Sequence, residues 1–112
     1  VRDFLYVEDA VAGMAALAFV LSNGLQSPGV VNLCSGIAIT VRKFAETVAD
    51  ALDASRGLLH FGAIPMRSRE IVHMVGDAGR LNCLTPWRPA YTLERGLTMS
   101  AAELSAKMRS AG

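Results

Sequence analysis

Residues 2–9 have the sequence Arg2-Asp3-Phe4-Leu5-Tyr6-Val7-Glu8-Asp9, and the segment that follows, Ala10 to Leu21, carries no charged side chain. Asp9 stands where a side chain often caps the first turn of a helix. Asn23-Gly24 follows the segment and suits the left-handed backbone at which many helices end. The pattern predicts a helix over residues 10–21. Because this helix is apolar on every side, we expect it to have neighbours all round.

Two short apolar segments after this helix predict β-strands. The first is Val30-Val31-Asn32-Leu33-Cys34, which ends at Ser35-Gly36, and the second is Leu58-Leu59-His60-Phe61-Gly62. Both have the length and composition of strands buried in a parallel sheet. Between them, Thr40 is expected to cap an amphipathic helix. The apolar face of that helix comprises Val41, Phe44, Ala45, Val48, Ala51 and Leu52.

The remaining residues predict a loop, two further helices and a break between them. Ala63 to Glu70 is expected to be a loop, and Ile71 to Val75 an extended segment. A short helix capped by Asp77 is expected to run through Leu84, and the prolines of Thr85 to Pro89 end it. Thr92 caps the last helix, whose apolar stripe is Leu93, Leu97, Ala101, Leu104 and Met108. The expected fold class is therefore α/β, a partial Rossmann-like unit with short strands and about four helices.

Composition places the chain in one soluble domain and excludes several function classes. Of its 112 residues 52% are apolar, and its 11 basic side chains nearly balance 10 acidic ones. This balance argues against binding to nucleic acid or to an acidic membrane surface. The longest uncharged run, Ala10 to Pro28, contains polar residues and is too short in its apolar part to span a bilayer. We expect a cytoplasmic protein.

The cysteines and histidines do not predict a metal site. Cys34 and Cys83 lack ligand spacing and are expected to be reduced core residues. His60 and His73 have no Cys, His or carboxylate at ligand spacing and are interpreted as packing or surface residues.

Five sequence blocks, in a fixed order, link the chain to a known family. They are Arg2 to Asp9; Val31-Asn32-Leu33-Cys34-Ser35-Gly36; the helix start Thr40-Val41-Arg42; Arg67-Ser68-Arg69-Glu70; and Asp77-Ala78-Gly79-Arg80-Leu81 with Trp87-Arg88-Pro89 and Thr92-Leu93-Glu94-Arg95-Gly96-Leu97. With these blocks and spacings the chain resembles the C-terminal, substrate-binding portion of extended short-chain dehydrogenases/reductases, the NAD-dependent nucleotide-sugar epimerases and dehydratases. One departure lies in the fourth block, where the family usually has Arg-Pro-Gly before an acid.

The resemblance implies that residues 1–112 form a C-terminal substrate-binding portion, without the N-terminal dinucleotide-binding part. Full-length members use NAD(P), but we expect this chain alone to bind no cofactor. The family's catalytic Tyr is followed four residues later by Lys, whereas Tyr6 is followed by Ala10 and Tyr91 by Arg95. The Gly-rich stretch Gly76 to Asn82 places Asp77 where a pyrophosphate would sit, so it does not predict a nucleotide site. No catalytic residue is predicted.

The same resemblance assigns three substrate-binding residues. In similar enzymes the arginines matching Arg2 and Arg67 reach the diphosphate of a sugar nucleotide, and the acid matching Glu70 lies near its ribose. A guanidinium offers a planar fork of donors to phosphate oxygens, and a carboxylate accepts from ribose hydroxyls. The alternative is that Arg67 and Glu70 form a solvated surface ion pair and that Arg2 is frayed near the start of the chain.

Two functions remain open at this stage. In the first, the chain is the nucleotide-sugar-binding part of an NAD(P)-dependent epimerase, dehydratase or reductase. In the second, it is a non-catalytic truncated protein that associates with itself or binds another protein through exposed apolar faces. The expected partners are a nucleotide-diphosphate sugar in a complete enzyme, and either further copies of the chain or the missing N-terminal half. The apolar faces would instead be covered if Ala63 to Glu70 and the last helix folded back over them.

Overall fold

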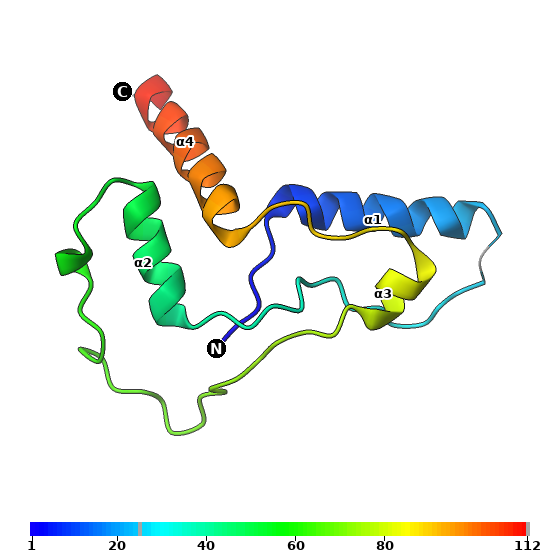
Figure 1. Cartoon of the computed structure of the whole chain (residues 1–112), viewed down its shortest axis with the longest axis horizontal. Coiled ribbons are helices and arrows are strands. Elements are labelled where there is room, and N and C mark those ends of the chain that lie inside the picture. The colour runs from blue at the N-terminus through cyan, green and yellow to red at the C-terminus, as the bar shows by residue number, and fades with distance from the viewer. Residues whose placement is uncertain (25, 112) are drawn as a thin grey trace.

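The computed structural model describes residues 1–24 and 26–111, which form four α-helices and one 3₁₀ turn (Figure 1). These elements are α1 (Val7–Ser22), α2 (Val41–Ala51), η1 (Arg56–Leu58), α3 (Gly79–Leu84) and α4 (Leu93–Ala111). The number of helices agrees with the sequence-based expectation.

Both predicted strands are wrong. In the described residues the only β pairing is two isolated bridges, which join Arg2 to Ile39 and to Met74. Residues 30–34 are irregular, with Val30 85% exposed, and Leu58 belongs to the 3₁₀ turn. A short apolar run becomes a strand only beside another strand. Here the backbone around residue 30 instead accepts hydrogen bonds from a side chain: Arg80 Nη1 lies 2.9 Å from the Val30 carbonyl oxygen.

Helix α1 starts three residues earlier than predicted, because Asp9 is not its cap. Tyr6 occupies the cap position and makes no side-chain cap bond. Asp9 lies inside the first turn, 3% exposed, and its carboxylate accepts hydrogen bonds from the backbone NH of Ala90 at 2.9 Å and of Tyr91 at 3.0 Å. The predicted end is confirmed, since the helix stops at Ser22 and Gly24 has φ +96°.

The other predicted helix starts agree closely with the structure. Thr40 Oγ1 accepts from Lys43 NH at 3.0 Å and Thr92 Oγ1 from Arg95 NH at 3.2 Å. The predicted cap of the third helix is one residue off: Ala78 occupies the cap position of α3, and Asp77, just before it, accepts from Gly79 NH at 2.8 Å. Helices α2 and α4 pack side by side (Figure 1).

Trp87 closes the small core, and its indole holds α1 in place. The buried apolar residues are Ala49, Ala78, Leu81 and Trp87. The indole Nε1 donates to the Asp9 carbonyl oxygen at 3.0 Å. A Cβ on Gly13 would lie 2.5 Å from Leu33 Cδ1 and 3.1 Å from Trp87 Cε2, so this glycine permits the close contact. The inner side of α1 is thereby fastened to Leu33 and Trp87.

Asp3 ties together three segments that are distant in sequence. Its carboxylate accepts from Ser35 Oγ at 2.6 Å and from the backbone NH groups of Ser35 (2.9 Å), Gly36 (2.8 Å) and Gly76 (3.2 Å). Partial burial raises the pKa of this carboxyl, but the hydrogen bonds outweigh burial and lower the pKa below its ordinary value. Residues 2–3 are therefore firmly placed.

The molecule is flat and open. Its extents are 52 × 42 × 21 Å and its radius of gyration is 17.3 Å, whereas a compact chain of this length has about 13 Å. Every residue of the loop Ala63 to Glu70 is exposed, and many apolar side chains of α1 stay exposed too, so the loop does not cover that helix. None of the described helices combines the length and apolar character needed to cross a membrane.

Candidate functional site

All three predicted substrate-binding residues line one open hollow of about 780 Å³, here called the basic hollow. It lies where the first residues of the chain meet the start of α2 and the segment 62–72. Its lining comprises Val1, Arg2, Val41, Gly62, Ile64, Pro65, Met66, Arg67, Glu70, Ile71 and Val72.

Arg2 is not frayed. Its backbone NH donates to the Ile39 carbonyl at 2.7 Å and its carbonyl accepts from Ile39 NH at 2.9 Å. Its guanidinium Nη2 lies 3.2 Å from Glu70 Oε1. The expectation of a loose Arg2 is therefore wrong, because pairing with residues far along the chain holds it at both backbone and side chain.

Arg67 does not form the predicted ion pair with Glu70. Glu70 pairs with Arg2 instead, and its backbone NH donates to the Arg67 carbonyl at 3.1 Å in a tight turn. Among the described residues the Arg67 guanidinium has no ion-pair or hydrogen-bond partner, and its side chain is exposed. The hollow thus presents the guanidinium of Arg67, which has no partner among the described residues, and that of Arg2, which forms an ion pair with Glu70.

This arrangement is suited to an anionic ligand. The Arg2–Glu70 pair is partly exposed, and such pairs contribute only about 0–1 kcal/mol. Charge-assisted hydrogen bonds from guanidinium to phosphate are stronger, about 1.5–3 kcal/mol each. An incoming phosphate can therefore displace Glu70 from Arg2.

The loop beside Arg67 is anchored to α2 by a cation–π contact. The guanidinium carbon of Arg42 lies 3.9 Å from the ring centroid of Phe61. This contact fixes the start of the segment that carries Arg67.

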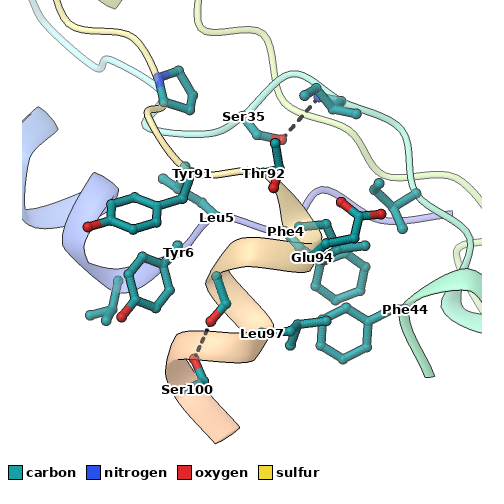
Figure 2. A pocket seen from close by; sticks show the side chains of 16 residues that line it. Phe4, Leu5, Tyr6, Ser35, Phe44, Tyr91, Thr92, Glu94, Leu97 and Ser100 are labelled. Atoms are coloured by element: carbon teal, nitrogen blue, oxygen red, sulfur yellow. Dashed lines mark hydrogen bonds between the residues drawn. The ribbon is translucent and has the colours of Figure 1, made fainter. Parts of the chain in front are cut away.

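A second cavity, of about 500 Å³, lies between the first residues, α2 and the start of α4 (Figure 2). We call it the aromatic pocket. The rings of Phe4 and Phe44 stack with centroids 4.0 Å apart, and those of Tyr6 and Tyr91 lie 4.7 Å apart. Its full lining is Phe4, Leu5, Tyr6, Val7, Ser35, Ile37, Ile39, Phe44, Pro89, Tyr91, Thr92, Leu93, Glu94, Gly96, Leu97 and Ser100.

Two hydroxyl groups of the aromatic pocket bond to other protein groups. Tyr91 OH donates to Glu8 Oε2 at 2.8 Å, and this bond, with burial, raises the pKa of Tyr91. Ser100 Oγ donates to the Gly96 carbonyl at 2.9 Å (Figure 2). Sequence reasoning missed this pocket. Its one signal was the alternation of Phe4 and Tyr6 in an extended segment, which places both rings on one side.

The cysteines and histidines form no metal centre within the part of the chain that the structure describes. Cys34 is half-buried, and burial together with nearby Asp3 raises the pKa of its thiol. Cys83 is exposed, so the expectation that both thiols are core residues is wrong for this one. His60 and His73 are both exposed.

Comparisons with known proteins give a likeness of fold. No protein-family model matches the sequence, and no curated protein matches it. Among solved structures, the crystal structure of UDP-galactose 4-epimerase matches with a TM-score of 0.69 and 24% sequence identity. The match covers 94% of this chain and 33% of that one. The chain therefore has an epimerase-like fold and spans about a third of that enzyme's length. The likeness of fold supports the α/β class, although the described residues are mostly helical.

Proposed function

We propose that this chain is the C-terminal, substrate-binding part of an NAD(P)-dependent nucleotide-sugar epimerase, dehydratase or reductase. The observation that carries the proposal is the meeting of Arg2, Arg67 and Glu70 in one hollow, although 65 residues or more separate the first from the others. The likeness of fold to UDP-galactose 4-epimerase supports it.

In this proposal the three side chains divide the recognition of a nucleotide diphosphate. Arg67, which is free of protein partners among the described residues, binds the diphosphate directly. Arg2 turns from Glu70 to the diphosphate as the ligand enters. Glu70, released from Arg2, accepts hydrogen bonds from the ribose hydroxyls.

The chain's own residues supply binding but no chemical step. We assign no catalytic residue, because neither Tyr6 nor Tyr91 has a lysine four residues later. NAD(P) is expected to be held by another part of the complete enzyme, where it would supply the hydride chemistry. The chain alone is expected to bind no nicotinamide cofactor.

The test is a titration of the chain with uridine, UDP, UDP-galactose and NAD, followed by NMR. We expect UDP and UDP-galactose to shift the amide signals of Arg2 and of residues 67–70. We expect uridine to bind at least about tenfold more weakly, the loss of roughly one charge-assisted hydrogen bond. Equal binding of uridine and UDP, or shifts confined to the aromatic pocket, would contradict the proposal.

A second candidate function, self-association or protein binding, is favoured by the shape of the chain. Among the described residues four apolar side chains are buried, and the radius of gyration of 17.3 Å exceeds that of a compact domain. Exposed apolar surface of this extent usually indicates an interface.

A further inference from the structure

In the free chain, Glu70 occupies a guanidinium that a phosphate ligand would need. Glu70 Oε1 lies 3.2 Å from Arg2 Nη2. The other terminal nitrogen of Arg2, Nη1, donates to the Val1 carbonyl oxygen at 2.9 Å. Of the two terminal nitrogens, Nη2 is therefore the one that faces Glu70, and a phosphate that bonds to it competes with this carboxylate.

Glu70 stays near Arg2 even when their ion pair is broken. Its backbone NH donates to the Arg67 carbonyl oxygen at 3.1 Å, and a few residues further on Met74 NH donates to the Val1 carbonyl oxygen at 3.0 Å. The side chains of Arg2 and Glu70 are 28% and 37% exposed, so both have room to change rotamer. The pair can thus separate by side-chain rotation, but the released carboxylate remains at the hollow.

The charges of the hollow make this release unfavourable for a simple anion. The charged side chains of its lining are Arg2, Arg67 and Glu70, so two positive charges and one negative charge give a net charge of +1. Among the described residues, Arg2 is the ion-pair partner of Glu70. A phosphate that takes Arg2 therefore leaves a carboxylate without its counter-ion beside a second negative charge, and like charges repel.

A pair of neighbouring hydroxyl groups offers Glu70 the partners that a phosphate lacks. An ionised carboxylate only accepts hydrogen bonds, and its two oxygens can accept from two hydroxyls on adjacent carbons. A ligand with both a phosphate and such a diol replaces the lost partner of Arg2 and that of Glu70. An anion without a diol replaces only the first.

We propose that Glu70 is the specificity-determining residue of the basic hollow, an inference that rests on the proposed function because it takes a nucleoside diphosphate as the ligand. Glu70 holds Arg2 in the free chain and opposes the binding of anions that carry no diol. It thereby excludes inorganic phosphate and diphosphate, which share the charge of the ligand but not its hydroxyls.

The test compares UDP with 2′,3′-dideoxy-UDP, which has the same base and charge but no ribose hydroxyls. Calorimetric titration of the unchanged chain and of Glu70→Ala gives the affinities. We expect Glu70→Ala to bind dideoxy-UDP and inorganic diphosphate about two- to fivefold more tightly, because the competing ion pair is gone. UDP should bind more weakly, and the preference for UDP over dideoxy-UDP should shrink at least about tenfold, the loss of a charged hydrogen bond.

Glu103→Ala is the matched control, since it removes one negative charge on α4, outside the hollow. It should leave the affinities for UDP, dideoxy-UDP and diphosphate unchanged. If Glu70 only accepts from the ribose, dideoxy-UDP will bind Glu70→Ala and the unchanged chain equally; if its role is structural, every ligand will bind more weakly. Either result overturns the inference and leaves UDP binding, the basis of the proposed function, intact. Failure of the unchanged chain to bind UDP contradicts the proposed function, and the inference falls with it.

A second variant covers the case in which Glu70→Ala fails to fold. Glu70→Gln keeps the size of the side chain and removes only its charge. It should also bind dideoxy-UDP more tightly than the unchanged chain, by a smaller factor, because a neutral amide still accepts from Arg2 but more weakly. Equal or weaker binding of dideoxy-UDP by Glu70→Gln contradicts the inference.

Discussion

The two walls of the basic hollow are held in place very differently. The wall that carries Arg2 is fixed by backbone pairing with Ile39 and by the hydrogen bonds that Asp3 accepts. The wall that carries Arg67 consists of residues 60–71, all of which are exposed. It is joined to the first wall only at its end, where Val1 bonds to Val72 and Met74, and by the Arg2–Glu70 pair. One wall is thus set in advance, whereas the other can adjust to a ligand. A site built in this way gains specificity from the fixed arginine, whereas the exposed Arg67 side chain has room to change rotamer and meet the ligand.

The largest expected effect is the loss of stability in Asp3→Ala, which removes the hydrogen bonds that hold the Arg2 wall in place. Removing the carboxylate leaves the NH groups of Ser35, Gly36 and Gly76 without their acceptor, and we expect the free energy of unfolding to fall by about 2–4 kcal/mol. Urea denaturation measures this loss. Glu103→Ala, on the exposed side of α4, is the control and should change stability by less than about 0.5 kcal/mol. Equal stability of the two variants would mean that the Arg2 wall is not fixed by Asp3.

Arg67→Ala tests the adaptable wall and should change binding without changing stability. In a complete enzyme that contains this segment, we expect sugar-nucleotide affinity to fall by about 1.5–3 kcal/mol, the usual contribution of a charged hydrogen bond. Arg67→Lys should recover only part of the affinity, because lysine supplies the charge without the planar fork. Calorimetric titration measures the affinity of each variant, and thermal melting measures its stability. Unchanged affinity would remove Arg67 from the site.

The pH dependence of stability should also separate the two walls. Because the folded-state pKa of Asp3 is lowered, its stabilising contribution is complete above the ordinary carboxyl pKa and is lost as pH falls toward the folded-state value. We expect the urea midpoint to decline below about pH 5 and Asp3→Asn to flatten that decline. The residual slope includes Asp50, whose pKa is lowered by its hydrogen bond to Arg56. An identical slope in Asp3→Asn would contradict the assignment.

The smallest effect is expected for Arg42→Ala, which frees the Arg67 wall from α2. A cation–π contact at an exposed site contributes about 0.5–1 kcal/mol, so stability should change little. Hydrogen exchange should quicken in residues 60–64 and stay unchanged at residues 35–36. Arg109→Ala near the end of α4 serves as the control. Faster exchange at both walls would show that they are not independent.

Local sequence signals predicted the helices better than the strands. The caps Thr40 and Thr92 and the stop at Asn23-Gly24 act within one turn of the backbone, so they can be read without the fold. The apolar run Val30 to Cys34 is equally local, but a strand depends on a partner, and the described residues give it none. Aspartate is a residue type that often caps helices, yet the Asp9 carboxylate accepts hydrogen bonds from backbone NH groups about 80 residues away.

The candidate site was predictable from the family resemblance but not from the spacing of residues along the sequence. The resemblance selected Arg2, Arg67 and Glu70, and the structure places them around one hollow. Spacing alone suggested that Arg67 pairs with Glu70, whereas the observed pair joins Arg2 and Glu70 across 68 residues. The anchoring role of Asp3 was missed for the same reason, since Gly76 follows it by 73 residues.

The bonds that fasten α1 to residues 87–91 also fix the order of events during synthesis. Trp87 and Tyr91 reach Asp9 across 78 and 82 residues, so the inner side of α1 stays uncovered until residues 87–91 have left the ribosome. At about 5–20 residues per second this interval lasts roughly 4–16 seconds. During it, a helix that carries no charge from Ala10 to Leu21 offers both its faces to other nascent chains. We therefore expect the yield of folded protein in the cell to depend on chaperone capacity and growth temperature more strongly than its equilibrium stability alone would indicate.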